Sequence, residues 1–412
     1  MSTSPSPVRP SVHFDMHSIE SLGVMSCVVA KIKRAKKPLA WFGRGGAVTR
    51  ETDSRRHEVS MTPKAVSLFA GAGGLDVGFE RAGFETVWAN EFDPDAAATW
   101  RANRPGREHI MAEGDIAEHL GDLDGIGNVD VVFGGPPCQG FSVAGKMDPR
   151  DERSQLVWRF LDVVEMVQPK VFVMENVAAL GRLEKWRDVR EGISARGREI
   201  GYDVSFQIHH APDYGVPENR DRVIFIGVRA GSGDMECFYE RLLGHMAPPP
   251  TARETILSAG AYGSDENPQT CTSNVTLATN PVMRRSPYAG MLVNGAGRPI
   301  DLDGLAPTLP ASMGGNKTPI VDEAALRDPA RTNWFEEYHT GLVEGTLSPA
   351  TTTVPETIRR LTIAEAAAIQ TFPVGYKFVG RKTKQYRQIG NAVPCLLAQA
   401  VASAVREAYF EE

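Results

Sequence analysis

The pattern of hydrophobic and polar positions alternates between strand and helix from Ala65 onward. Short β-branched and apolar runs predict strands, and longer runs with apolar residues at helical spacing predict helices. The predicted strands are 66–69, 85–89, 129–133, 171–174, 204–208 and 223–228. The predicted helices end at Phe79 and span 95–103 and 156–167. This alternation predicts an α/β fold, a doubly wound, mixed but mostly parallel sheet with helices on both faces.

The alternation is lost between about Gly231 and Pro355, where Gly, Pro, Thr and Asn become frequent. We expect short strands and loops there, in a second and irregular domain. Helical patterning returns at 362–370, where Thr362 is an expected N-cap with Glu365 three residues later, and again at 394–409. The expected organisation is a first catalytic part at 63–230, an irregular domain at 231–357 and a return segment at 358–412.

Residues 1–62 differ from the rest, with Ser and Pro at the start followed by scattered Lys and Arg. We expect a disordered basic extension. A solvated tail is favoured over an arm that binds DNA. A second hypothesis is that Met61 is the natural start, because the pattern typical of folded structure begins immediately after it. No secretory signal pattern is present in this segment.

The composition is that of a globular chain. Of the 412 residues, 42% are hydrophobic and 23% are charged, and we find no uninterrupted apolar stretch long enough to span a bilayer. The five cysteines are scattered and odd in number, which argues against a disulfide framework or a zinc knuckle and favours a reducing, cytoplasmic setting. The net charge of −6 leaves a nucleic-acid partner open, because binding depends on local patches.

Candidate chemistry gathers at the ends of the predicted strands. Cys138 follows the strand 129–133 on a Gly-Gly-Pro-Pro loop, which can continue neither a strand nor a helix. Glu175 follows the strand 171–174, so both side chains should lie at one edge of the sheet, where open parallel sheets bind ligands. A lone cysteine is more often structural, and a lone glutamate is often a helix cap; the shared edge favours chemistry.

A glycine-rich turn, 70–74, follows the first predicted strand and allows close approach of a ligand to the backbone. Asp76 stands where a third glycine of the dinucleotide fingerprint would be, which weakens a nicotinamide oxidoreductase interpretation. Glu91 and Asp115 end later strands and could bind a ribose and an adenine. Each of these carboxylates alone is more often a helix cap or a solvated acid, but together they favour a nucleoside-bearing cofactor.

Arg220 and Arg222 alternate into a strand and should point to opposite faces. With the earlier features they complete a set of motifs that resembles the bacterial DNA (cytosine-5)-methyltransferases of restriction-modification systems. The resemblance covers about 65–229 and 359–404. The matching motifs, in chain order, are Leu-Phe-Ala-Gly-Ala-Gly-Gly at 68–74, Gly-Gly-Pro-Pro-Cys-Gln-Gly-Phe-Ser at 134–142, Met-Glu-Asn-Val at 174–177, Asn-Arg-Asp-Arg at 219–222, Arg-Leu-Thr at 360–362 with Gln-Thr-Phe-Pro at 370–373, and Gly-Asn-Ala-Val-Pro at 390–394.

The resemblance implies S-adenosylmethionine as cofactor and a discontinuous catalytic domain, in which the C-terminal segment packs against the first helix. The cofactor residues it implies are Phe69, Gly71, Gly73, Gly74, Glu91, Phe92, Asp115, Ile116, Pro137, Leu156, Asn391 and Val393. It implies Cys138 as nucleophile at carbon 6 of cytosine, Glu175 as hydrogen-bonding partner of ring nitrogen 3, Arg222 at the carbonyl oxygen and Arg220 as support.

By the same resemblance the substrate is double-stranded DNA with the target cytosine flipped out. The implied DNA contacts are Gln139, Ser142, Arg381 and Lys384, and residues 231–357 become a target-recognition domain. Base readers in that domain are left open among Arg284, Arg285, Arg298, Asn316 and Lys317. A monomer and a companion restriction endonuclease are expected, and no metal site or membrane association is predicted.

One position departs from the family pattern, because Glu218 stands where glutamine is frequent; we expect its carboxylate to order the arginines. Two rival functions remain. The first is methylation of cytosine in transfer RNA. The absence of a Cys-Phe-Thr signature argues against it, and the long irregular segment favours DNA. The second is a catalytically inactive DNA-binding repressor, against which the complete set of catalytic residues argues.

Overall fold

The computed structural model describes residues 62–137 and 155–411, which belong to one compact unit. The predicted basic extension, apart from Thr62, and the proposed start at Met61 lie outside the described residues. So do Cys138, Gln139 and Ser142.

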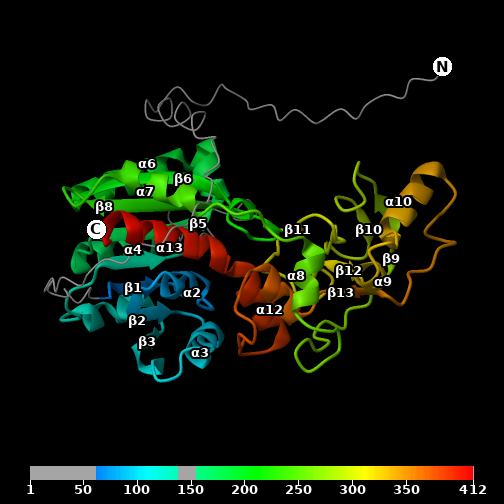
Figure 1. Cartoon of the computed structure of the whole chain (residues 1–412), viewed down its shortest axis with the longest axis horizontal. Coiled ribbons are helices and arrows are strands. Elements are labelled where there is room, and N and C mark those ends of the chain that lie inside the picture. The colour runs from blue at the N-terminus through cyan, green and yellow to red at the C-terminus, as the bar shows by residue number, and fades with distance from the viewer. Residues whose placement is uncertain (1–61, 138–154, 412) are drawn as a thin grey trace, which may run out of the picture. The chain divides into compact units, whose positions relative to one another are not determined.

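The centre of the fold is a seven-stranded sheet in the order β3-β2-β1-β4-β5-β8-β6 (Figure 1). The strands from β1 to β5 are mutually parallel, and β8 is antiparallel to both of its neighbours. Their bounds are β1 Lys64–Leu68, β2 Glu85–Glu91, β3 Met111–Glu113, β4 Val131–Gly134, β5 Val171–Val177, β6 Tyr202–His210 and β8 Asp221–Arg229. The predicted mixed, mostly parallel α/β fold is confirmed.

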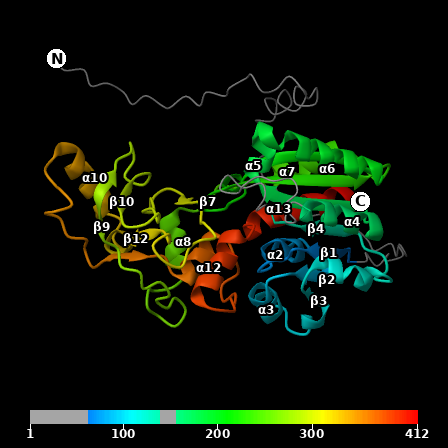
Figure 2. The same cartoon turned by 180° about the vertical axis from the view of Figure 1, so that it is seen from behind.

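Helices cover both faces of this sheet (Figures 1 and 2). They are α2 Gly74–Arg81, α3 Pro94–Ala102, α4 Leu156–Val167, α5 Ala178–Arg182, α6 Arg187–Glu199, α7 Met235–Gly244 and α13 Cys395–Tyr409. The bounds of α4 agree with the prediction, because its apolar spacing is regular and Pro169 follows it. Helix α6 was not predicted, because it is a polar helix in which only Ile193 and Gly197 are buried.

The winding of the sheet reverses between β1 and β4. Chain order runs outward from β1 through β2 to β3 on one side, and from β4 to β5 on the other. The turns that follow β1 and β4 therefore diverge and leave room between them, which is where open α/β sheets bind ligands. The glycine-rich turn and the Gly-Gly-Pro-Pro loop are these two turns.

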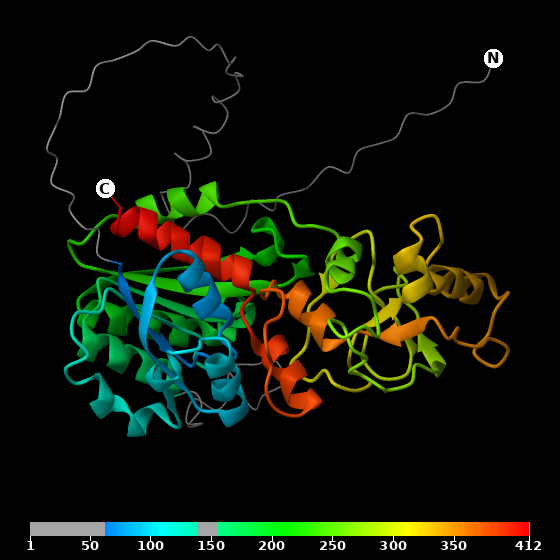
Figure 3. The same ribbon diagram turned by 60° about the horizontal axis from the view of Figure 1, so that its bottom comes forward.

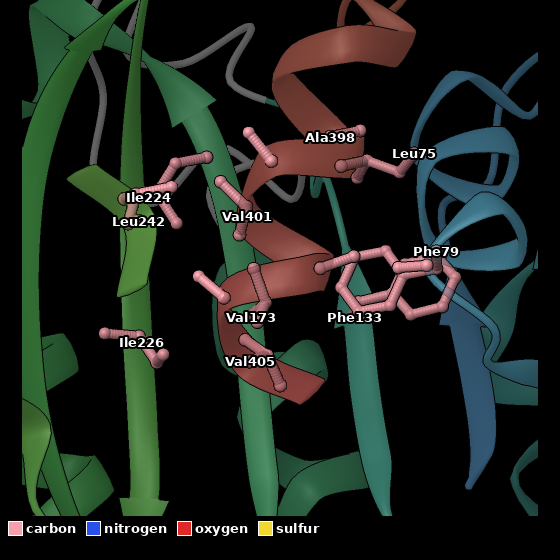
Figure 4. Close-up of a cluster of buried hydrophobic side chains, with 14 of the residues drawn as sticks. Leu75, Phe79, Phe133, Val173, Ile224, Ile226, Leu242, Ala398, Val401 and Val405 are labelled. Carbon is pink, nitrogen blue, oxygen red and sulfur yellow. The ribbon is translucent and has the colours of Figure 1, made fainter. Parts of the chain in front are cut away.

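The C-terminal segment returns to complete the core. Ala398, Val401 and Val405 of α13 point into the same cluster as Phe79 of α2 and Phe133 of β4 (Figure 4). The Phe79 and Phe133 rings are stacked, with centroids 3.9 Å apart. Apolar burial of this size is the main stabilising term in a domain, so β1 and α2 depend on residues more than 300 positions later.

Short elements outside the main sheet form the rest of the structure (Figure 3). The strands are β7 Glu218–Asn219, β9 Leu277–Val282, β10 Met291–Val293, β11 Ala306–Pro307, β12 Ile320–Asp322 and β13 Ile358–Arg360. The helices are α8 Ala252–Ser258, α9 Glu323–Arg327, α10 Trp334–Glu344, α11 Ile363–Ile369 and α12 Lys382–Asn391. The expected irregular character holds for β9 to β12. The sequence analysis missed α7, α8, α10 and α12, while the Thr362–Glu365 capping box at the start of α11 is confirmed.

One helical stretch, residues 382–409, is long and apolar enough by composition to cross a membrane, and 72% of its most apolar window is buried inside the protein. The stretch joins α12 and α13 across residues 392–394, so no single apolar run marks it in the sequence. Its buried side chains pack against α2 and α7, as expected of a core helix.

The contact between α2 and α13 yields a test. A methyl group at Gly78 would overlap the Cβ and backbone of Ala398. We expect Gly78→Ala to lower the free energy of unfolding by about 1–3 kcal/mol, because two packed helix backbones must separate. Gly244→Ala in α7 is the matched control, since a Cβ there would meet nothing within 4 Å. Urea unfolding of both variants measures the difference, and equal stabilities would contradict the packing argument.

Candidate active site

The glycine-rich turn after β1 has an unusual backbone. Phe69, Gly71 and Gly73 all have positive φ, at 54°, 57° and 85°. A Cβ at Gly71 would meet nothing within 4 Å, whereas one at Gly74 would lie 2.5 Å from the carbonyl oxygen of Val393. The turn is therefore open toward one side and packed against the return segment on the other, so two predicted cofactor residues, Gly74 and Val393, do meet.

Glu91, at the end of β2, is bonded to this turn. Its Oε2 accepts the Gly71 N–H at 2.7 Å, and its Oε1 accepts the Asp93 N–H at 2.8 Å. Burial raises the pKa of Glu91, and the backbone hydrogen bonds oppose that effect. Each oxygen retains capacity for another donor. The adjacent Phe92 is 71% exposed, so an aromatic face is available beside the carboxylate.

The other predicted cofactor residues lie on other loops and helix ends and differ in exposure. Asp115 is exposed and accepts the Ala117 N–H at 2.9 Å, which is the helix-cap role that the sequence also allowed. Ile116 is buried, Leu156 and Pro137 are half-buried, and Asn391 is exposed at the end of α12. Sequence reasoning missed Asn90, whose buried amide donates to the carbonyls of Ala112 and Gly114 and fixes the loop that carries Asp115.

Glu175 and Arg222 form a buried ion pair next to the loop that follows β4. Glu175 Oε1 lies 2.6 Å from Arg222 Nε, and both side chains are 11% exposed. A Cβ at Gly135 would lie 2.9 Å from Glu175 Oε2, so the carboxyl group touches the Gly-Gly-Pro-Pro loop. The neighbouring Asn176 donates to the Pro136 carbonyl at 3.1 Å. The expected placement of Glu175 beside this loop is confirmed; Cys138 itself lies outside the described residues.

Burial dominates the electrostatics of this pair. It raises the pKa of Glu175 despite the opposing Arg222 and Arg220 charges. Burial, helped by the charge of Arg220, lowers the pKa of Arg222 to about 10. A carboxyl group with a raised pKa retains its proton to higher pH and can then donate a hydrogen bond.

Arg220 has a different environment. It is 2% exposed, and its guanidinium donates to the carbonyls of Leu309, Gly390 and Ala392 at 3.2, 2.7 and 3.1 Å. It also pairs with Glu218 at 3.1 Å, and Glu218 accepts the Leu309 N–H at 2.6 Å. The two arginines thus point to different partners, as strand alternation predicts. Glu218 orders Arg220, as expected from its departure from the family pattern.

His209 is a further buried group near the pair that sequence reasoning missed. It lies opposite Arg222 in the β6–β8 register, and its Nδ1 is 3.0 Å from the Tyr214 hydroxyl. Burial lowers the pKa of His209 to about 4. The imidazole is therefore neutral at physiological pH, so no additional positive charge is buried beside the arginines.

The residues assigned to DNA have mixed surroundings. Arg381 is exposed at the start of α12. Lys384 lies 3.1 Å from Asp93 and 3.8 Å from Asp95, so its charge is largely balanced by the start of α3. Among the open base-reading candidates, Arg298 donates to the carbonyls of Ala289 and Gly290. Arg284, Arg285, Asn316 and Lys317 are exposed.

These features define an α/β protein with a glycine-rich turn after β1 and a buried acid–arginine pair between β5 and β8. Residues 63–407 match the family described as C-5 cytosine-specific DNA methylase. The chain belongs to this family and is a DNA cytosine-5 methyltransferase, as the sequence motifs predicted.

Curated relatives agree with this assignment. The chain is 33% identical over 359 residues to the Type II methyltransferase M1.HphI of Haemophilus parahaemolyticus, covering 84% of this chain and 87% of the relative. It is 32% identical to the Type II methyltransferase M.NgoPII of Neisseria gonorrhoeae, covering 84% and 95%. The fold resembles that of the S. pombe Dnmt2 methyltransferase, with a TM-score of 0.56 and 16% identity over 84% of this chain and 98% of that one.

The neutral His209 makes stability depend on pH. Its folded pKa of about 4 lies below the ordinary 6.5, so the unfolded chain binds the extra proton first as pH falls. We expect the free energy of unfolding to fall progressively as the pH is lowered from 6.5 to about 4, and His209 accounts for a loss of at most about 3 kcal/mol. His209→Gln should lose less stability than the wild type between pH 7 and 5, measured by urea unfolding. His109→Gln, at an exposed histidine, should follow the wild type.

Proposed function

We propose that the chain transfers a methyl group from S-adenosylmethionine to carbon 5 of a flipped-out cytosine in duplex DNA, through a covalent bond to Cys138. The observation that carries this proposal is the buried Glu175–Arg222 pair, which lies against Gly135, three residues before Cys138. When bound, the cofactor supplies an electrophilic methyl group on a sulfonium centre.

The described residues fit such a cofactor. Gly71 leaves open space above the turn, Glu91 has acceptor capacity for ribose hydroxyls, and the exposed Phe92 ring can stack on an adenine. We assign the same pocket to Phe69, Gly73, Gly74, Asp115, Ile116, Pro137, Leu156, Asn391 and Val393.

The protein's part in the reaction starts at the cytosine ring. The Cys138 thiolate adds to carbon 6, while Glu175 donates a hydrogen bond or proton to nitrogen 3 and Arg222 binds the carbonyl oxygen. The electron pair released toward carbon 5 would form the new carbon–methyl bond while the bond from the methyl group to the sulfonium sulfur breaks, which would leave the demethylated cofactor as a neutral thioether. Loss of the carbon 5 proton to a base then expels the thiolate and restores the aromatic ring. The raised pKa of Glu175 supports its role as donor.

In this scheme Arg220 positions other parts of the chain and does not contact the cytosine. Its bonds to Gly390 and Ala392 connect the residue just before β8 to the segment that packs on Gly74. We assign Gln139 and Ser142 to contacts with the DNA flanking the flipped base, and Arg381 to a phosphate. Lys384 is a weaker candidate, because it is already paired with acids.

The relatives' description as Type II methyltransferases supports a place in a restriction-modification system. We infer that the chain acts in the cytoplasm as a monomer and protects a DNA sequence from a companion endonuclease. Methylation of transfer RNA remains the rival activity, and a catalytically inactive repressor is the other.

Labelled methyl transfer to duplex DNA and to transfer RNA, run side by side, tests the proposal. We expect label in DNA alone, and none with Cys138→Ala, which should still bind DNA. Glu175→Gln should lower the transfer rate by about 10²–10⁴-fold, the usual contribution of a positioned acid. Label in RNA alone, or normal transfer by Cys138→Ala, would refute the scheme, and DNA binding without transfer by the wild type would favour the repressor.

The cofactor turn offers a separate test. The Tyr376 hydroxyl donates to the Ala72 carbonyl at 2.6 Å and lies 3.3 Å from Arg104. Tyr376→Phe removes this support, so we expect S-adenosylmethionine to bind about 2- to 10-fold more weakly, in line with one hydrogen bond. Calorimetric titration measures the effect. Tyr262→Phe, whose ring stacks under Arg359 in another part of the chain, is the control and should bind normally.

A further inference from the structure

The segment from Met283 to Gly290, here named the 283–290 loop, joins β9 to β10. Helix α10 lies beside these strands (Figure 1) and holds the loop at two points. His339 Nε2 donates to the Arg284 carbonyl at 2.8 Å, and the Tyr288 hydroxyl donates to Glu336 at 2.5 Å. Burial and the Glu336 carboxylate both raise the pKa of Tyr288, so its hydroxyl stays a donor.

The far end of the loop is held by Arg298. Its guanidinium donates to the carbonyls of Ala289 and Gly290, the latter at 3.1 Å. Gly290 also packs closely on its partner strand, since a Cβ there would lie 2.7 Å from the Val282 carbonyl oxygen. Arg298 is therefore occupied in bracing the loop, which removes it from the base-reading candidates.

The two charged side chains of this braced loop are Arg284 and Arg285. Both residues are exposed, and within the described ranges neither guanidinium has a hydrogen-bond or ion-pair partner. Several other arginines in this part of the chain are paired: Arg253 with Asp303, Arg327 with Glu323, and Arg359 with both Glu323 and Glu365. A fixed backbone thus presents two adjacent, uncommitted guanidinium groups.

Such an arrangement suits base reading. A guanidinium binds the O6 and N7 of guanine with two parallel hydrogen bonds in the major groove, a geometry that no other base pair offers. Holding the loop in advance reduces the entropy lost on binding, which is how rigid scaffolds give loops specificity. Lysine in the same place would keep the charge but not the paired hydrogen bonds.

We propose that Arg284 and Arg285 read guanine in the DNA site of this enzyme, with Tyr288, His339 and Arg298 as positioning residues for the loop. The inference rests on the proposed function and adds to it the residues and the base that set specificity.

The test compares methylation patterns. Bisulfite sequencing of plasmid DNA treated with the wild type gives the modified sequence. The full-length Arg284→Lys/Arg285→Lys variant is then assayed on duplexes that carry this sequence or single-guanine replacements of it. We expect preference for the wild-type sequence over one of the guanine replacements to fall by roughly tenfold or more, with the charge retained. Tyr288→Phe should weaken the same preference to a smaller extent.

Arg331→Lys is the matched control, because Arg331 is also exposed in this part of the chain, and it should leave the preference unchanged. Unchanged preference in the double Lys variant would overturn the inference. A second result would also overturn it. Methylation of all duplexes would fall equally in the Arg284→Ala/Arg285→Ala variant, with a smaller salt dependence, and the double Lys variant would restore it. That result marks a phosphate contact. Failure of the proposed function is distinct, because the wild type itself would then methylate no cytosine.

Discussion

The architecture of this enzyme depends on the close contact between α2 and α13. Two glycines on α2 make it possible, because they carry no side chain. A Cβ at Gly74 would overlap the Val393 carbonyl oxygen, and a Cβ at Gly78 would overlap Ala398. Helix α2, which begins at the glycine-rich turn, is thereby fixed by a segment that is remote in sequence. Without that contact the apolar face of the sheet around Phe133 would lose its cover, and the turn at 70–74 would lose its rear wall.

The second organising principle is the burial of charge near β8. Glu175, Arg222, Arg220 and Glu218 are all buried, and each has a partner of opposite charge. Such groups add little net stability, because desolvation offsets their attraction. Their value is positional: Arg222 holds the Glu175 carboxyl group beside the Gly-Gly-Pro-Pro loop, while Arg220 ties three chain segments together. His209 stays neutral beside them, which limits the positive charge buried there.

Sequence reasoning succeeded where local pattern and tertiary packing agree. The strands β1, β4, β5 and β8 are apolar on both faces, so their existence was plain, and the capping box of α11 is a local signal that needs no tertiary context. The placement of Glu175 beside Gly135 followed from strand-end geometry. Polar helices such as α6 and α12 escaped detection, because few of their residues are buried. Asn90, His209 and Tyr376 escaped for another reason: their roles come from partners far away in the chain.

The return of α13 also has a consequence for biosynthesis. Domains usually fold from the N-terminal end as the ribosome releases the chain. Here the glycine-rich turn at 70–74 is synthesised early, yet the carbonyl that packs against it belongs to Val393 and the helix that follows ends at Tyr409. The cover of β1 and β4 is therefore incomplete in a nascent chain until α13 has been synthesised. A fragment released before α13 would contain the motifs at 68–74, 174–177 and 219–222 but would lack the residues that pack behind the glycine-rich turn, so methylation of DNA requires that synthesis has passed α13.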